Sequence, residues 1–491
     1  MSAHLFKATL LLGCLLAAAC RGGDGATGPL GNSGVRIVGG INLTDTITAR
    51  PPQGLVVEVR DDNGVPLANT VVRFEAVRST VPGRTFEPTI LVAPQTSQLF
   101  NTFAAVPTNE RGRAVVVLQF GTVAGPAKLV VTVPDLGTRD TVRYEVLAGN
   151  AARIAFTARD TVVRSGATYS LGASSADRFG NRRPNDNITF TAGPSVAAVD
   201  AAGVVTAGDV GLGFVVATTA MTKDTARLTV VPVGSLVVAS ARTGSPVVAT
   251  MDLDGTNYQV IATVSGTEVY PKWNRQGTKI LFQWGESGAA HLYVVSPGGA
   301  PQRLLDASAG IGSDAYGRFS ADGNTVYFSG RAASAPGYAL NLFRVRQGES
   351  SVEYLGPGTP GQDYGYSPDP SPDEARVVFS SGRTLELMDL ASGQLTDYGT
   401  SGAMPHFSPD GRLIAYIAAE GPLMVMNPDG SGKRSVSAGH TYQGSAGFDW
   451  SPDGRWLIIR GNSGLELINV QSGQLLALPY SAALYQPAFH P

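Results

Sequence analysis

A five-residue motif recurs through the second half of the chain, and this repetition constrains the fold more than any other feature of the sequence. Each copy starts at an anchor residue and ends in a polar turn: Trp273–Gly277, Phe319–Gly323, Pro370–Glu374, Phe407–Gly411 and Trp450–Gly454. Successive anchors are 46, 51, 37 and 43 residues apart, and a sixth copy begins 39 residues after the last of them, just before the chain ends. Such periods are typical of propeller blades, whose small sheets must pack on one another.

The repeats predict a ring that is closed by both of its ends. Each copy is followed by two apolar strands and a glycine turn, so one repeat should form a four-stranded meander. Residues 236–262 contain strands but no preceding motif, whereas Leu484–Phe489 supplies that strand with no further strand after it. The two segments should therefore share one blade. Five whole blades and one shared blade predict a six-bladed propeller over residues 235–491, without a free sheet edge.

The residues of the motif resemble those of a known family of propellers. Ser-Pro-Asp-Gly after an aromatic anchor, as in Phe407–Gly411 and Trp450–Gly454, resembles the TolB-like, WD-repeat-like propellers. The copy at Pro370–Glu374 departs from it, with proline for the aromatic residue and glutamate for the glycine. Members of the TolB family carry an α/β domain before the propeller, and this chain has strand-rich modules there. The resemblance therefore implies the propeller fold and gives only weak support to a Tol–Pal role.

Two β-rich modules are expected before the propeller, at residues 36–148 and 150–233. In the first, the apolar strand Leu55–Arg60, the turn Asp61–Gly64 and the strand Thr70–Glu75 resemble bacterial immunoglobulin-like (Ig-like) domains of the invasin and intimin group. In the second, the hairpin Ala198–Ala207 before a Gly-rich strand is similar to the second group of such domains. The predicted fold class is thus all-β, with two Ig-like β-sandwiches and a propeller. The modules would serve as an adhesin stalk or, as we favour, a spacer.

The N-terminus predicts export and lipid attachment. Residues 8–19 are free of charge but too short to span a bilayer, and they end in small residues before Cys20. The segment Ala17–Cys20 resembles the lipobox of bacterial lipoproteins. This makes residues 1–19 a signal peptide, Cys20 the lipidation site and residues 20–35 a flexible Gly-rich tether. Arg21 lacks the aspartate that favours inner-membrane retention, so the resemblance implies the outer membrane. The alternative is an ordinary secretory signal in which Cys20 is incidental.

Composition and motifs argue against several kinds of chemistry. The formal net charge is −2 and no basic stripe is present, so nucleic acid is not an expected partner. The sequence has no nucleophile elbow, His-Glu-x-x-His motif or phosphate loop, and its five histidines lack metal-ligand spacing. The aspartate of each repeated motif is expected to hydrogen-bond its own turn. We therefore predict a protein that is not an enzyme and that has neither a metal nor a cofactor.

Two sets of residues are candidates for a binding site. The residue just before each anchor should face the central channel. There it either provides the polar lining that a water-filled channel needs or binds a ligand. These residues are Lys272, Arg318, Asp369, His406 and Asp449, with Ala488 in the sixth copy. On the face opposite the short turns, longer loops carry tyrosines that could contact a partner: Tyr316, Tyr338, Tyr364, Tyr366 and Tyr442.

The sequence leaves three functions open. The leading prediction is an envelope-anchored, non-catalytic binding or scaffold protein, exported across the inner membrane, whose propeller binds a protein or a glycan. The membrane would be contacted only through the lipid. One alternative is a structural spacer or assembly factor of the envelope, and another is a lyase or hydrolase that acts in the channel.

Overall fold

Strands make up nearly all regular structure in the chain, as the alternating apolar pattern predicts. The computed structural model describes residues 34–264, 269–286, 289–333, 340–356, 365–382, 384–419, 421–437 and 439–491. The expected signal peptide, Cys20, and the tether up to residue 33 lie outside these ranges. Within them the only helices are the 3-10 turns η1 (Pro134–Leu136), η2 (Ala307–Ala309) and η3 (Pro479–Ser481), and no helix could cross a membrane.

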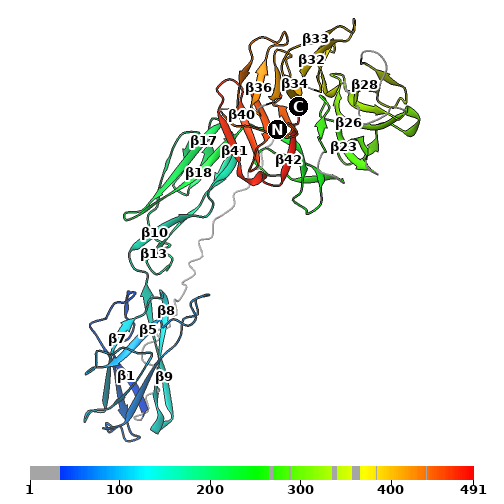
Figure 1. The fold of residues 1–491 in the computed structure, drawn as a ribbon. Helices are drawn as coiled ribbons and strands as arrows, with labels where there is room; N and C mark the ends of the chain where they lie inside the picture. Colours follow the sequence, from blue (N-terminus) through cyan, green and yellow to red (C-terminus); the bar gives the residue numbers. More distant parts are fainter. Residues whose placement is uncertain are drawn as a thin grey trace, which may run out of the picture. The chain divides into compact units, whose positions relative to one another are not determined.

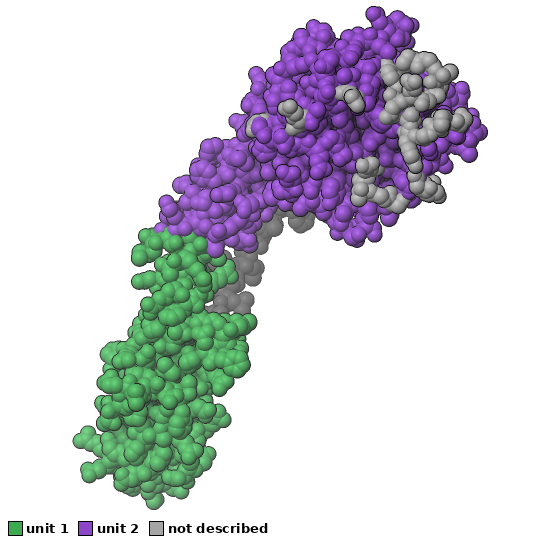
Figure 2. Space-filling model, viewed as in Figure 1, with its two compact units in different colours: residues 1–154, 174–186, 220–222 green, residues 155–173, 187–219, 223–491 purple. Residues whose placement is uncertain are grey.

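The chain divides into two units (Figure 1; Figure 2). The first contains the described residues up to 154, together with 174–186 and 220–222, and the second contains 155–173, 187–219 and 223–491. Strands β10 (Ala151–Phe156) and β13 (Ala173–Asp177) each contribute residues to both units. The division into domains at residues 148–150 and 233–235 stays a prediction.

Two sheets around one core make up most of the first unit, and their strands are antiparallel except for the parallel pair β2–β9. Strand β7 shows why they form: its residues alternate, and Ala114, Val116, Leu118 and Phe120 point into the core. One sheet has the order β1 (Gly34–Gly39), β3 (Leu55–Arg60), β7 (Arg113–Phe120), β5 (Ile90–Pro94); the other has β2 (Thr44–Thr46), β9 (Thr138–Leu147), β8 (Gly125–Val133), β4 (Val71–Ala76), β6 (Phe103–Pro107).

The second unit begins with a smaller set of sheets. The expected hairpin is present, because β15 pairs with β16 and leads into β17. One sheet has the order β11 (Thr161–Arg164), β18 (Lys223–Val231), β17 (Gly211–Thr218), β14 (Thr189–Ala192); the other has β12 (Thr168–Ser170), β16 (Val204–Ala207), β15 (Val196–Val199). Arg164 fastens this part to the following repeats through ion pairs with Asp252 (3.1 Å) and Asp254 (2.9 Å).

Six four-stranded antiparallel sheets follow, counted over the described residues of 235–489 (green to red in Figure 1). They are β42 (Leu484–Phe489), β19 (Ser235–Ser240), β20 (Val247–Asp252), β21 (Gln259–Thr263); β22 (Lys272–Trp273), β23 (Ile280–Glu286), β24 (Ala289–Val295), β25 (Gln302–Arg303); β26 (Ile311–Phe319), β27 (Thr325–Ala332), β28 (Asn341–Arg346), β29 (Val352–Tyr354); β30 (Tyr366–Pro370), β31 (Arg376–Ser381), β32 (Thr384–Asp389), β33 (Leu395–Asp397); β34 (Gly402–Phe407), β35 (Ile414–Ala418), β36 (Leu423–Met426), β37 (Arg434–Ser435); and β38 (Phe448–Trp450), β39 (Trp456–Arg460), β40 (Leu465–Asn469), β41 (Leu475–Leu478).

The six sheets pack in a cycle. Each shares one apolar cluster with the next, so that β27 and β28, for example, pack on β31 and β32 through Tyr327 and Phe379. The last sheet packs on the first, where Ile458 and Leu467 meet Leu236 and Met251. Strand β42 pairs antiparallel with β19, with Phe489 opposite Leu236 and Leu484 opposite Ser240, as the sequence predicts.

The repeated motif forms a turn that is held by its own side chains. In the last full copy, Ser451 Oγ donates to Asp453 (2.6 Å) and accepts from the Trp456 N–H (2.9 Å). The same pair of hydrogen bonds forms at Ser320, Ser371 and Ser408. Each of these aspartates therefore holds its turn, as expected. The divergent copy keeps this turn because Glu374 adopts the left-handed φ of 56° that glycine adopts in the other copies.

Candidate functional site

The residues before the anchors lie together on the inner strands of the sheets. Lys272, Arg318, Asp369, His406 and Asp449 come from β22, β26, β30, β34 and β38, and all five line one hollow. Each inner strand starts its sheet at the axis of the ring, so one position per repeat faces the channel. The structure thus brings the whole predicted set together.

Opposite charges in this set are paired with each other. Lys272 Nζ lies 3.3 Å from Asp449 and donates to the Phe448 carbonyl oxygen (2.9 Å). Arg318 Nε lies 3.3 Å from Asp369, and the guanidinium also hydrogen-bonds to the ring of His406. The hollow is therefore polar without a large net charge.

Burial shifts the titration of these groups. It lowers the pKa of Lys272 to about 7, an effect that nearby Arg318 increases. It raises the pKa of Asp369 to about 6, although Arg318 opposes that rise. Burial also lowers the pKa of His406 well below its usual value, so this imidazole is neutral at pH 7.

Two of the carboxylates also join neighbouring sheets. Asp369 accepts a hydrogen bond from the Phe407 N–H (2.8 Å), and Asp449 accepts one from the Phe489 N–H (3.1 Å). In both cases an inner strand is held by the sheet before it. These aspartates thus have a structural role at the positions where the sequence allowed a ligand site.

A second ring of residues lies two positions before the first, and only its member Tyr316 was a candidate from the sequence. In every sheet this residue has a positive φ: Tyr270 (41°), Tyr316 (52°), Ser367 (52°), Met404 (53°), Gly447 (63°) and Gln486 (46°). Five of the six are not glycine, so each costs about 1 kcal/mol or more of strain. A bulge at this point redirects the side chain, and register shifts occur here in the β26, β30 and β34 pairings. Of the six, only Gly447 has a residue type that signals this conformation.

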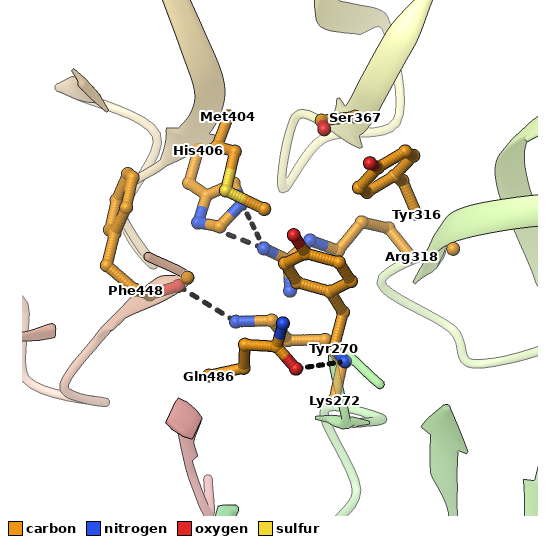
Figure 3. A pocket seen from close by; sticks show the side chains of 11 residues that line it. Tyr270, Lys272, Tyr316, Arg318, Ser367, Met404, His406, Phe448 and Gln486 are labelled. Carbon is orange, nitrogen blue, oxygen red and sulfur yellow. Dashed lines mark hydrogen bonds between the residues drawn. The ribbon is translucent and has the colours of Figure 1, made fainter. Parts of the chain in front are cut away.

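The two rings enclose the narrow part of the channel (Figure 3). The rings of Tyr270 and Tyr316 lie 5.1 Å apart at an angle of 50°, and in Figure 3 both are drawn above Lys272. Gln486 Oε1 accepts from the N–H groups of Val269 (2.9 Å) and Tyr270 (3.0 Å). The cavity left between the rings is about 20 Å³, room for about one water molecule.

Wider hollows open at both ends of the channel. On the side of the repeated turns a hollow of about 280 Å³ combines the channel charges with anchor side chains such as Trp273 and Trp450. On the loop side are two hollows. The one of about 320 Å³, the tyrosine hollow, contains Tyr270, Tyr316 and Tyr366. The one of about 350 Å³, the amide hollow, contains Gln443, Asn462, Tyr485 and Gln486.

The predicted loop tyrosines differ in position and burial. Tyr316 and Tyr366 are half-buried and line the tyrosine hollow. Tyr442 lines the amide hollow, but it is largely buried: its hydroxyl donates to Glu466 (2.8 Å) and its ring packs on the neighbouring core. Tyr338 and Tyr364 lie outside the described residues.

Metal-binding groups were also sought in the described part of the chain. No three or more His, Cys, Asp or Glu side chains there are grouped so that they could hold a metal ion.

The packed sheets around a lined channel define this part of the chain as a β-propeller. More particularly, residues 234–453 match the family model of the TolB beta propeller domain, so the propeller is TolB-like. No curated protein matches the chain.

Several solved structures are similar at low identity. TolB from Acinetobacter baumannii is 14% identical over 64% of this chain and 84% of its own, with a TM-score of 0.42. A putative TolB from Agrobacterium tumefaciens is 16% identical over 53% and 100%, with a TM-score of 0.38. A periplasmic gluconolactonase from Pseudomonas aeruginosa is 13% identical over 53% and 99%, with a TM-score of 0.35.

Proposed function

We propose that this protein is a non-catalytic binding protein of the bacterial cell envelope, which recognises a protein or glycan partner at the loop-side mouth of its propeller. The observation that carries this proposal is the pair of adjoining loop-side hollows, whose described lining combines tyrosines and uncharged polar side chains with one arginine, Arg460. Concave sites with aromatic walls and a few polar groups are the usual form of a binding site.

The proposed architecture has a lipid anchor at Cys20, two Ig-like sandwiches and a six-bladed propeller. The cyclic packing of six sheets and the pairing of β42 with β19 support six blades. The two sheets around one core in the first unit support the first sandwich. The ion pairs of Arg164 would make the second sandwich a firm support for the propeller rather than a loose tether.

The state of the channel supports binding over catalysis. A general acid or base needs a titratable group that can reach a substrate. Here Lys272 and Asp449 bind each other, and Asp369 already accepts from the backbone of the next sheet. The cavity between the rings has room for about one water molecule, so a substrate could approach these groups only from the turn-side hollow.

Capture of partners from the cell envelope tests the proposal. The lipidated protein in detergent is coupled to beads and exposed to solubilised envelopes and to a cell-wall digest, and bound material is identified by mass spectrometry. The Tyr316→Ala, Tyr366→Ala double variant alters the loop side, while Arg412→Ala, on an exposed turn-side residue, serves as the control.

We expect the wild type and the control to retain the same partner and the double variant to lose most of it. Equal capture by all three proteins would place binding elsewhere, with the sandwich modules as the better candidate. A double variant that no longer melts cooperatively would mean that these tyrosines are packing residues.

A further inference from the structure

We propose that the ligand of the loop-side mouth is a saccharide chain, which lies across the tyrosine hollow and the amide hollow. This inference rests on the proposed function and deepens it by naming the class of ligand. It comes from the arrangement of aromatic, carboxamide and charged groups around the two hollows.

The two hollows adjoin each other at the loop-side mouth. Ser445 lines both of them. Each also borders the narrow channel, the amide hollow through Gln486 and the tyrosine hollow through Tyr270 and Met404. A ligand that enters one hollow therefore meets the other, and a chain of several linked rings fits this layout better than a single small molecule.

Carboxamide groups gather in the amide hollow. Gln443 and Asn462 are exposed there, and the Oε1 atom of Gln486 is fixed by the N–H groups of Val269 and Tyr270. Fixing Oε1 leaves the Nε2 group of Gln486 to donate. A carboxamide offers donors and an acceptor side by side, which matches neighbouring hydroxyls on a sugar ring, since each hydroxyl both donates and accepts.

Aromatic faces complete the site. Tyr366 and Tyr316 line the tyrosine hollow beside glycines and other small residues, and Tyr485 is exposed at the amide hollow. Tyrosine presents an apolar face together with a polar hydroxyl, and so suits the apolar C–H face and polar rim of a sugar. The small residues leave the ring faces room for a flat ligand.

The charges of the lining narrow the class of ligand. Among the described residues, neither hollow is lined by an aspartate, glutamate or lysine, and Arg460 is the one charged residue in their lining. Its guanidinium lies 4.8 Å from the centre of the Tyr485 ring, and it also donates to the Ser481 carbonyl oxygen (3.3 Å). The described lining thus offers a cationic ligand no carboxylate and an anionic ligand only an arginine that already has partners, whereas hydroxyl groups find several polar partners.

A binding assay with defined saccharides tests the inference. The full lipidated chain in detergent is titrated calorimetrically with tetrasaccharides of glucose, N-acetylglucosamine, mannose and galacturonate, the last to separate acidic from neutral sugars. We expect at least one to bind. Tyr366→Ala, and separately the Gln443→Ala, Asn462→Ala double variant, should weaken that binding by about tenfold or more. Arg412→Ala on the turn side should leave it unchanged.

Loss of a ring hydroxyl gives a sharper readout. A site built to hydrogen-bond hydroxyls strongly rejects an analogue that lacks one, because its polar groups are then left unpaired. A deoxy analogue of the bound saccharide should therefore bind at least tenfold more weakly than the parent. Equal binding of the two would overturn the hydrogen-bonding role of the carboxamides.

The outcomes separate this inference from the proposed function. If no saccharide binds with a Kd below about 1 mM, while the loop-side variants still lose a protein captured from envelopes, the ligand is a polypeptide and only the inference fails. If the loop-side variants lose neither a saccharide nor a protein, both proposals fail. If a saccharide binds equally well to the wild type and all variants, its site is elsewhere and the inference fails.

Discussion

The two mouths of the channel are built in opposite ways. The turn-side mouth is framed by copies of one short motif, whose Ser and Asp side chains satisfy the backbone within each turn. The loop-side mouth is framed by connections of unequal length and by ring residues as different as Tyr316, Met404 and Gln486. The repeated side stabilises the propeller and the variable side is free to recognise a partner, because no shared hydrogen-bond scheme restricts its residues.

Charge separates the two mouths as well. The turn-side hollow contains the paired charges of Lys272, Arg318, Asp369 and Asp449, whereas the described lining of the loop-side hollows has Arg460 as its one charge. Substitutions on the turn side should therefore change stability, and those on the loop side should change binding.

The channel has two mouths because the six sheets form one closed ring. Removal of β42 tests this closure and should have the largest effect on stability. A chain that ends at Ala483 loses the strand that pairs with β19, together with buried Leu484, Ala488 and Phe489. It exposes a sheet edge and opens the ring. We expect the propeller to lose its cooperative thermal transition, as followed by circular dichroism, while removal of Pro491 alone has little effect. A normal melting curve for the shorter chain would show that β42 does not close the ring.

Asp449→Ala should give the next largest effect. It leaves the buried Lys272 ammonium without its carboxylate and the Phe489 N–H without its acceptor. At pH 5 the Lys272 ammonium, whose pKa is about 7, is charged, and breaking a buried ion pair in this way costs about 3 to 5 kcal/mol of unfolding free energy. Urea unfolding measures the loss, and Asp453→Ala, in an exposed turn position of the same sheet, should cost less. An unchanged midpoint for Asp449→Ala would contradict the structural role of the turn-side charges.

Asp369 predicts a dependence of stability on pH. Burial raises its pKa to about 6 in the folded protein, above its value of 3.8 in the absence of the fold. The folded state then binds the proton more tightly, so Asp369 favours folding below pH 4, and this contribution is lost as the pH rises through 6. Relative to Asp369→Asn, the wild type should lose on the order of 2 to 3 kcal/mol between pH 4 and pH 7.

Unfolding curves of the two proteins at pH 4, 5, 6 and 7 measure this difference. The variant has no group that titrates at this position, so a constant difference in stability between the proteins would contradict the prediction. Subtracting the unfolding free energies of the two proteins at each pH also removes the effects of other titrating groups, which both proteins share.

Glu374→Gly should give the smallest effect, with the opposite sign. Glu374 has a φ of 56° where the other copies have glycine, and its carboxylate accepts from the Asp322 N–H (2.9 Å). Relief of the strain outweighs this exposed hydrogen bond, so we expect a stabilisation of up to about 1 kcal/mol. Gly411→Ala, at the equivalent position of the next copy, should instead destabilise the fold. Thermal melting measures both variants. Equal changes in melting temperature for Glu374→Gly and Gly411→Ala would contradict the conclusion that the two copies form the same left-handed turn.

The sequence predicted the parts of this structure that depend on local patterns. The repeat spacing and alternation locate the inner strands, so Lys272 and His406 could be assigned to the channel before the structure was seen. The pairing of β42 with β19 followed from the strand that residues 236–262 lack. In these cases the signal lies within one repeat or in the comparison of two repeats.

Other features depend on tertiary packing that no local pattern reveals. Tyr442 lines the loop-side amide hollow, but the sequence did not predict that its ring is buried and that its hydroxyl donates to Glu466 on β40. The second ring, whose six residues have a positive φ, was not predicted as a set because Tyr270 and Met404 are residue types that rarely adopt a positive φ. The turn-side hollow was not predicted either, because its depth depends on how the anchor side chains of several sheets pack together.

The backbone conformation of the second ring affects how such a protein could evolve. Its five strained positions already hold Tyr, Ser, Met and Gln side chains with the same backbone conformation. The bulge sets the direction of the side chain, and the identity of that side chain does not set the bulge. A lineage could therefore exchange one ring residue at a time and acquire new ligands through point mutations, while the ancestral scaffold of sheets is inherited unchanged.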